Sequence, residues 1–119
     1  MDAKCTVYRT ADFIGKRWTL LILLEMYKNK GGWKRYSAIK GKLPDITAKI
    51  LSARLKELEK LGLVSKKVDA SSYPIKCEYS LTPSGTDFIR IIKGMKTWAL
   101  KWNIKNKACE SQDCSECSI

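Results

Sequence analysis

The stretch that decides the fold is ITAKILSARLKELEKLGL, residues 46–63. An α-helix turns by about 100° per residue, which places Leu51, Leu55 and Leu58 on one side. The opposite side carries cationic or small side chains, namely Lys49, Ser52, Ala53, Lys56 and Lys60. A basic face with small residues, on a helix that follows a short helix and a tight turn, is the design of a helix-turn-helix reader of DNA. The alternative interpretation is a solvated amphipathic helix without a partner. Features elsewhere in the sequence distinguish the two interpretations.

The charge of the chain favours an anionic partner. Its 119 residues include 23 Lys and Arg against 12 Asp and Glu, a formal charge of +11. Residues 108–119 contain acidic side chains and no Lys or Arg, so the positive excess lies before them. This balance favours nucleic acid or an anionic membrane surface as partner, and solubility alone is the alternative explanation of the charge. We expect one DNA-binding and dimerisation domain over residues 1–107 and an acidic, cysteine-containing tail over residues 108–119.

Several function classes are disfavoured by what the sequence lacks. The segment MDAKCTVYRT has no apolar run of the secretory type, and the run at residues 20–24 is too short to span a bilayer. We therefore expect a cytoplasmic protein without membrane contact. The chain contains no histidine, the commonest general base, and no glycine-rich phosphate loop. The sequence predicts neither an enzyme nor a bound cofactor.

Hydrophobic periodicity and turn residues predict the order of the elements. Helices are expected over residues 7–14 and 16–27, then a short strand over 33–36 and a short helix over 37–43 with Ser37 near its N-cap. Pro44 and Asp45 form the turn into the helix of residues 46–63, which ends at Gly62. Strands over 64–68 and 76–81 form a hairpin, and Thr82-Pro83 begins a helix to about residue 105. This is the order of a mainly α winged helix-turn-helix domain with a small β-hairpin.

Three segments resemble the HxlR-type transcriptional regulators, small dimeric winged-helix proteins related in architecture to the MarR group. They are GKRWTLLILLEMY at residues 15–27, RYSAIKGKLPDITAKILSARLKELEKLGLV at 35–64 and YPIKCEYSLTPSG at 73–85. Cys5 and Trp98-Ala99 also resemble the family at their positions. The resemblance covers about residues 5–102 in the order of the family, and the tail from Cys109 lies outside the family's pattern. It implies a regulator that binds double-stranded DNA sequence-specifically as a homodimer. A dimer predicts a pseudo-palindromic operator.

This hypothesis assigns DNA contacts to three groups of residues. On the helix of residues 46–63, those expected closest to DNA are Thr47, Ala48, Lys49, Ser52, Ala53 and Lys56. Phosphate contacts near other helix starts are expected from Lys16, Arg17, Lys34, Arg35, Tyr36 and Ser37. The hairpin wing offers Lys66, Lys67, Tyr73 and Lys76. For any single lysine, a solvated surface charge is the simpler interpretation, and Arg54 is expected to pair with a neighbouring glutamate.

The last helix is apolar on more than one side, more than a domain of this size can bury by itself. The homodimer is therefore expected to form through the N- and C-terminal helices. The residues assigned to it are Val7, Phe13, Ile89, Ile92, Met95, Trp98 and Trp102, although some of these must fill the core of their own protomer.

The five cysteines suggest that thiol or metal chemistry supplies a regulatory signal. The family resemblance implies a redox or electrophile sensor at Cys5, which has Lys4 and Arg9 nearby, and an inert thiol at a dimer interface is the alternative. Cys109, Cys114 and Cys117 are one ligand short of a closed zinc site, unless the tail folds back to Cys5. We therefore assign no metal and favour a flexible tail with reactive thiols. Cys77 is expected in core packing.

Two other functions stay open from the sequence. One is a winged-helix module that binds RNA or protein; exposed aromatic rings for base stacking would favour RNA, and Tyr36 and Tyr73 are the candidates. A metal or redox sensor would instead couple thiol chemistry to regulated DNA binding. The operator and any small-molecule or oxidant effector are not identified by the residues.

Overall fold

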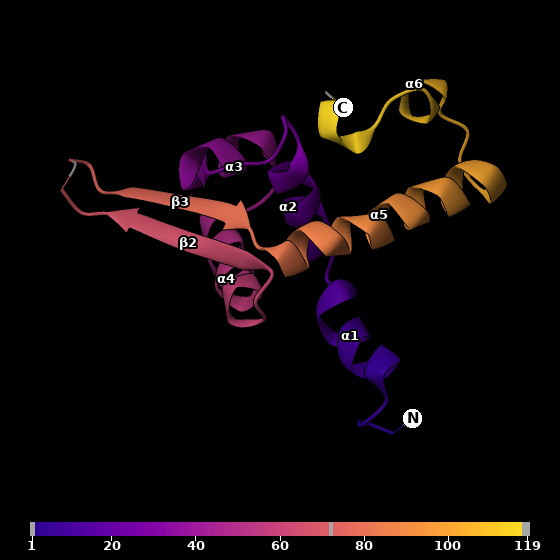
Figure 1. The fold of residues 1–119 in the computed structure, drawn as a ribbon, viewed down its shortest axis with the longest axis horizontal. Helices are drawn as coiled ribbons and strands as arrows, with labels where there is room; N and C mark the ends of the chain where they lie inside the picture. Colours follow the sequence, from indigo (N-terminus) through magenta and orange to yellow (C-terminus); the bar gives the residue numbers. More distant parts are fainter. Residues whose placement is uncertain (1, 72, 118–119) are drawn as a thin grey trace.

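The computed structural model describes residues 2–71 and 73–117, with the elements arranged as in Figure 1. The helices are α1 (Thr6–Ile14), α2 (Arg17–Tyr27), α3 (Tyr36–Lys42), α4 (Ala48–Lys60), α5 (Pro83–Trp102), α6 (Lys107–Glu110) and the short 3₁₀ turn η1 (Cys114–Glu116). The strands are β1 (Lys34–Arg35), β2 (Val64–Asp69) and β3 (Lys76–Leu81). The predicted order of helices and strands is confirmed.

The three strands form an antiparallel sheet in the order β1-β3-β2. Strands β2 and β3 pair from Val64 opposite Leu81 to Asp69 opposite Lys76. Figure 1 shows this hairpin projecting from the helices as a wing. Strand β1 pairs with the other edge of β3, with Lys34 opposite Tyr79. Because β1 runs directly into α3, its ladder bonds attach the start of α3 to the base of the wing.

The core lies where α2, α4 and α5 meet. The buried residues that these helices contribute include Ile22, Leu23, Met26, Leu51, Leu55, Leu58, Phe88, Ile89 and Ile92. The α4 leucines are at most 1% exposed. Full burial of one leucine side chain contributes about 1.5–3 kcal/mol, so the three together hold α4 firmly in one rotation about its axis. That rotation determines which side chains α4 presents to solvent.

Helix ends follow the capping signals in the sequence, with one exception. Thr82 Oγ1 accepts from the Gly85 N–H at 3.1 Å, and Pro83 is the first residue of α5. Gly62 ends α4 with φ +82°, the left-handed conformation that glycine adopts without strain. The N-cap of α3 is Arg35, which makes no side-chain cap bond, because strand β1 ends one residue earlier than expected; Ser37 lies two residues further on, in the first turn.

Two residues assigned to dimer contacts lie instead in the core of their own protomer. Ile89 is 2% exposed and Ile92 is 8% exposed, so their assignment is corrected. Their positions on α5 face α2, and the helix can bury only the side that faces its own domain. Phe13 is partly buried, with its ring centroid 6.1 Å from that of Phe88. The remaining assigned residues stay exposed, namely Val7, Met95, Trp98 and Trp102.

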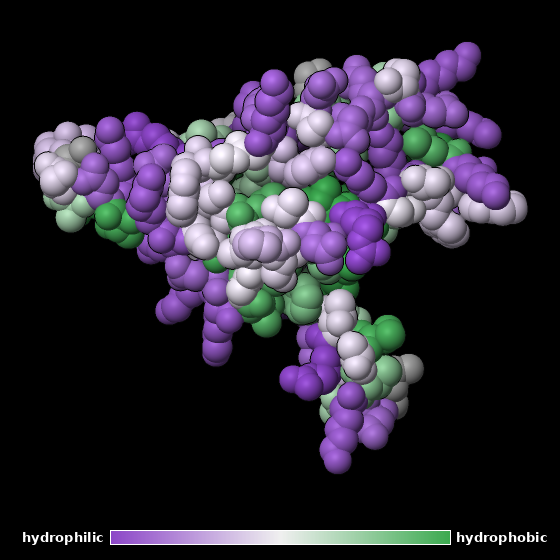
Figure 2. All heavy atoms as spheres, viewed as in Figure 1, coloured by the Kyte–Doolittle hydropathy of each residue, from purple (hydrophilic) through white to green (hydrophobic). Residues whose placement is uncertain are grey.

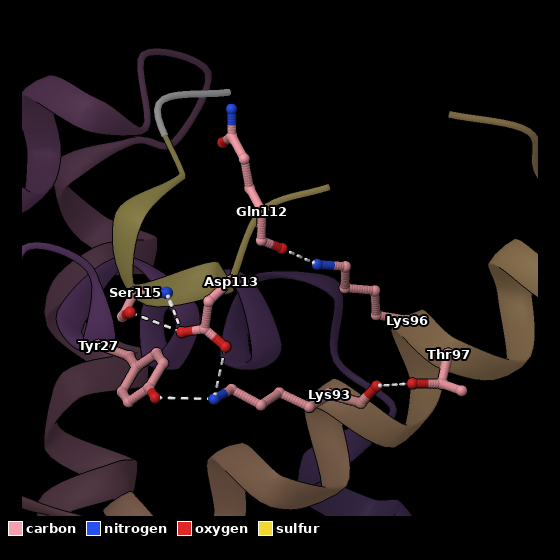
Figure 3. A network of polar contacts seen from close by, with 7 residues as sticks. All are labelled: Tyr27, Lys93, Lys96, Thr97, Gln112, Asp113 and Ser115. Carbon is pink, nitrogen blue, oxygen red and sulfur yellow. Dashed lines mark hydrogen bonds and ion pairs between the residues drawn. The ribbon is translucent and has the colours of Figure 1, made fainter. Parts of the chain in front are cut away.

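The acidic tail folds back onto α2 and α5, which differs from the flexible tail that we expected (Figure 3). Lys93 Nζ donates to Asp113 Oδ1 and to the Tyr27 hydroxyl, each at 2.9 Å. The Asn29 N–H donates to the Ser115 carbonyl oxygen at 2.8 Å. Hydrogen bonds from Ser115 and Lys93 hold the pKa of Asp113 well below its usual range. The bonds to Tyr27 and Asp113 raise the pKa of Lys93. Both charges therefore persist over the neutral pH range.

A pair of substitutions on α5 tests how closely its first turn packs. A Cβ atom added at Gly85 would lie 2.1 Å from the Leu63 carbonyl oxygen. Gly85→Ala should therefore lower the free energy of unfolding by about 1–3 kcal/mol or more. Gly94 meets nothing within 4 Å, so Gly94→Ala should raise it by up to about 1 kcal/mol through helix propensity. Urea unfolding followed by circular dichroism measures both changes, and equal effects would contradict the close contact.

Candidate nucleic-acid interface

The outward face of α4 is cationic and open to solvent. All residues expected closest to DNA on this helix are exposed, namely Thr47, Ala48, Lys49, Ser52, Ala53 and Lys56. Thr47 also caps the helix, because its Oγ1 accepts from the Ile50 N–H at 3.2 Å. Short side chains between the lysines allow the helix backbone to approach a surface closely. The face therefore combines positive charge with little steric bulk.

A groove of about 720 Å³ separates α4 from the wing. Its walls are Arg35, Tyr36, Ser37, Ser52, Lys56, Glu59, Lys66, Pro74, Ile75, Cys77 and Tyr79. Figure 2 shows that hydrophilic side chains gather along the wing and beside α4 on the viewed face. The groove thus brings together cationic side chains from α4, the wing and the segment before α3. Three elements that are distant in sequence share one anion-compatible surface.

Tyr36, the first residue of α3, connects that helix to α4. Its hydroxyl group donates to the Ala48 carbonyl oxygen at 3.0 Å and lies 3.1 Å from Ser52 Oγ. Tyr79 forms the inner wall, where burial raises its pKa together with the charges of Cys77, Glu59 and Tyr36. The two tyrosines thus line the groove beside the cations Arg35, Lys56 and Lys66.

The wing presents its lysines on two sides. Adjacent residues of a strand point to opposite faces, and Lys66 lines the groove while Lys67 does not. Lys67 Nζ lies 4.7 Å from the centroid of the Trp33 ring, as a cation–π pair. Tyr73 near the wing tip is fully exposed, and Lys76 is exposed at the start of β3. The wing can therefore contact a partner through its tip and through its groove side.

Two cations expected to contact phosphate are bound within the fold. Lys16 Nζ pairs with Glu57 Oε2 at 2.9 Å, and Arg54 reaches the same carboxylate at 3.4 Å. The expected pairing of Arg54 is confirmed. Lys34 Nζ donates to the carbonyl oxygens of Glu25 and Lys28, and burial lowers its pKa. Lys34 therefore caps the end of α2, which corrects its assignment as a phosphate contact.

Arg17 stays exposed, with its guanidinium 4.6 Å from the centroid of the Trp18 ring. This stacking leaves the edge of the guanidinium available for other hydrogen bonds. Arg35 and Ser37 both line the groove, where they were expected to take part.

Sequence reasoning missed part of the groove. The residues not anticipated there are Glu59, Pro74, Ile75, Cys77 and Tyr79. The hairpin register contained a signal for two of them, because residues directly opposite in a sheet point to the same face. Lys66 stands opposite Tyr79, and Cys77 follows on the same face two residues away along β3. Cys77 also packs against the core, as expected.

The cysteines are partly buried, and Cys5 is the N-cap residue of α1. No residue of α1 is buried, so Cys5 lies beside a helix that has an open surface. Within residues 2–71 and 73–117, no group of three or more Cys, Asp or Glu side chains is placed to hold a metal ion. Cys109, Cys114 and Cys117 therefore do not assemble a site with Cys5. In the same described part of the chain, no helix is both long and apolar enough to cross a membrane.

Known proteins share this fold and sequence. Residues 13–107 match the HxlR-like helix-turn-helix family. Over 94 residues the chain is 36% identical to the Bacillus subtilis protein YvaP, named as an uncharacterised HTH-type transcriptional regulator, and the match covers 79% of this chain and 83% of YvaP.

Solved structures agree with that match. A transcriptional regulator of the MarR family from Porphyromonas gingivalis superposes with a TM-score of 0.75 at 32% identity, over 87% of this chain and 97% of that one. The redox regulator HypR in its oxidised form superposes with a TM-score of 0.70 at 34% identity, over 84% and 99%. These likenesses confirm the winged helix-turn-helix architecture. The chain therefore belongs to the HxlR-like helix-turn-helix family of transcriptional regulators.

Proposed function

We propose that this protein regulates transcription by binding double-stranded DNA as a symmetric homodimer, with α4 of each protomer in the major groove. The single observation that carries the proposal is the outward face of α4, where exposed Lys49 and Lys56 flank short side chains. Lysine can contact guanine acceptors or phosphate, and the alanine methyl groups can contact thymine methyl groups. The wing then contacts the backbone or the minor groove through its tip and through Lys66. Residues 1–107 form the DNA-binding and dimerisation unit of this proposal, and residues 108–119 form a tail.

Duplex DNA fits this surface better than single-stranded RNA does. Recognition of splayed bases needs open aromatic rings as stacking platforms. The Tyr36 ring is partly buried and its hydroxyl is engaged with α4, while Lys67 lies over the Trp33 ring, which is 45% exposed. Tyr73 is fully exposed beside the groove, and a single fully exposed ring is too few for a platform.

The proposed dimer uses the exposed apolar side chains of α1 and α5. Val7, Met95, Trp98 and Trp102 all keep large exposed fractions in the single chain. The Trp98 side chain is 59% exposed, and aromatic side chains of this size dominate the energetics of interfaces. A symmetric pair predicts a pseudo-palindromic operator whose half-sites are one helical turn of DNA apart, or a multiple of it.

The proposed regulation is through thiol oxidation. HypR is described as a redox regulator, and its structure covers most of this chain. Cys5 is partly buried at the start of α1, one of the two helices assigned to the dimer. Oxidation that joins this thiol to a second thiol as a disulfide, with two electrons and two protons passing to the oxidant, would change the packing at that interface and, through it, the spacing of the two α4 helices.

Lys49→Ala tests the DNA-binding face. The variant should bind a selected operator about 5- to 150-fold more weakly, corresponding to about 1–3 kcal/mol. Affinity of the unsubstituted protein should fall roughly 10³- to 10⁵-fold between 50 and 200 mM salt if six to ten phosphates are contacted. Fluorescence anisotropy measures both effects. Lys105→Ala removes an exposed lysine outside the groove and should bind normally; an equal loss in both variants, or no salt dependence, would refute the assignment.

Trp98→Glu tests the homodimer. A charge on the exposed apolar face of α5 should convert the dimer to a monomer at micromolar concentration without unfolding the protomer. Analytical ultracentrifugation gives the mass, and circular dichroism gives the helix content. Ser84→Glu places the same charge on the exposed first turn of α5 and should stay dimeric. A monomeric mass for the unsubstituted protein would end the proposal of a dimer.

Cys5→Ser tests the redox response. Treatment with the thiol oxidant diamide should change the operator affinity of the unsubstituted protein, and dithiothreitol should reverse the change. The serine variant should bind DNA in the reduced state and stay insensitive to diamide. A gel shift across a diamide series measures this. If Cys5→Ser responds like the unsubstituted protein, the sensor is another thiol, and Cys114→Ser and Cys117→Ser are the next variants to compare.

A further inference from the structure

A short hydrogen-bond chain orients one hydroxyl on the outward face of α4. The Tyr36 hydroxyl lies 3.0 Å from the Ala48 carbonyl oxygen and 3.1 Å from Ser52 Oγ. A carbonyl oxygen can only accept, so the single phenolic proton of Tyr36 goes to Ala48. The remaining contact is then satisfied only when Ser52 donates its proton to the Tyr36 oxygen. The chain runs in one direction, from Ser52 through Tyr36 to Ala48.

This direction uses up the one proton that Ser52 can donate. A free serine hydroxyl is both a donor and an acceptor, and it rotates to suit its partner. Here the side chain is exposed, but its proton is committed to Tyr36. What Ser52 presents to an approaching molecule is therefore a pair of acceptor lone pairs. Its cationic neighbours Lys49 and Lys56 are donors without acceptor capacity, so Ser52 adds an acceptor to a face of donors.

We propose that Ser52, oriented by Tyr36, selects a base that carries an exocyclic amino group in the major groove, adenine through N6 or cytosine through N4. These two amino groups are the hydrogen-bond donors that bases display in that groove. Guanine and thymine present acceptors there, which would face the lone pairs of Ser52 without a proton between them. The inference rests on the proposed entry of α4 into the major groove and adds a base preference to it.

Tyr36 is a positioning residue in this proposal, because it acts on the base through Ser52. A phenylalanine at this position would keep the ring and lose the oxygen. Ser52 would then be free to donate as well as accept, and guanine or thymine would be tolerated at the same operator position. A residue that only supported the packing of α4 would change affinity for all sequences alike.

Selection from a random duplex library, followed by sequencing of bound DNA, tests the proposal. The position read by Ser52 is the one at which Ser52→Ala loses its preference. There, the unsubstituted protein should favour one orientation of the base pair by about two- to tenfold, with adenine or cytosine on one fixed strand relative to the operator centre, which is the effect of one neutral hydrogen bond. Ser52→Thr keeps the hydroxyl and should keep the preference. Tyr36→Phe should lose most of it at that position alone.

The controls separate this inference from the proposed function. Tyr8→Phe removes the same atom from an exposed tyrosine on α1 and should leave the base preferences unchanged. Circular dichroism checks that each variant is folded. If Tyr36→Phe unfolds, the proposal is tested by whether Ser52→Ala loses the base preference. No enrichment by the unsubstituted protein would refute the proposed function itself. Sequence-specific enrichment in which Ser52→Ala removes no preference for the orientation of a base pair, or an unchanged preference in folded Tyr36→Phe, would refute only the role of Ser52 and Tyr36.

Discussion

The burial of Leu51, Leu55 and Leu58 is the constraint on which the rest of the structure depends. An amphipathic helix has one rotation that puts its apolar stripe into a core, and rotating α4 away from it would expose these side chains at a cost of several kcal/mol. Once that rotation is fixed, the lysines and small residues point away from the domain. The same rotation brings Ser52 to the Tyr36 hydroxyl, 3.1 Å away. The packing of the core and the chemistry of the outward face are thus set by the same three leucines.

Features decided within a few residues of chain were predictable from the sequence. The Thr82 cap, the helix end at Gly62 and the face of α4 all follow from local hydrogen bonding and periodicity. The apolar residues of α5 show where this reasoning ends. Ile89 and Trp98 are both apolar positions on one helix, yet one is 2% exposed and the other 59%. Periodicity identifies an apolar side chain, and only the arrangement of the other helices decides what covers it.

Charged side chains are harder to place than apolar ones, because a flexible lysine takes the nearest available acceptor in three dimensions. Lys16 pairs with Glu57, which is 41 residues away in sequence. Lys34 bonds to carbonyl oxygens at the end of α2 that are unsatisfied within the helix. Neither partner is visible from the local sequence around the lysine. Part of the positive charge of the chain is therefore used inside the fold, and a count of lysines overstates what the groove presents to DNA.

The tail packs on one side of α5, and the exposed apolar residues of α5 lie on the opposite side. At about 100° per residue, Lys93, Lys96 and Thr97 share the side that the tail occupies, where Asp113 pairs with Lys93 and the Gln112 carbonyl oxygen accepts from Lys96. Met95, Trp98 and Trp102 lie about half a turn away. A partner protomer that covers the aromatic side would therefore not displace the tail. The acidic tail extends the packing of its own protomer by joining the end of α2 to α5, and it leaves the surface assigned to the dimer open.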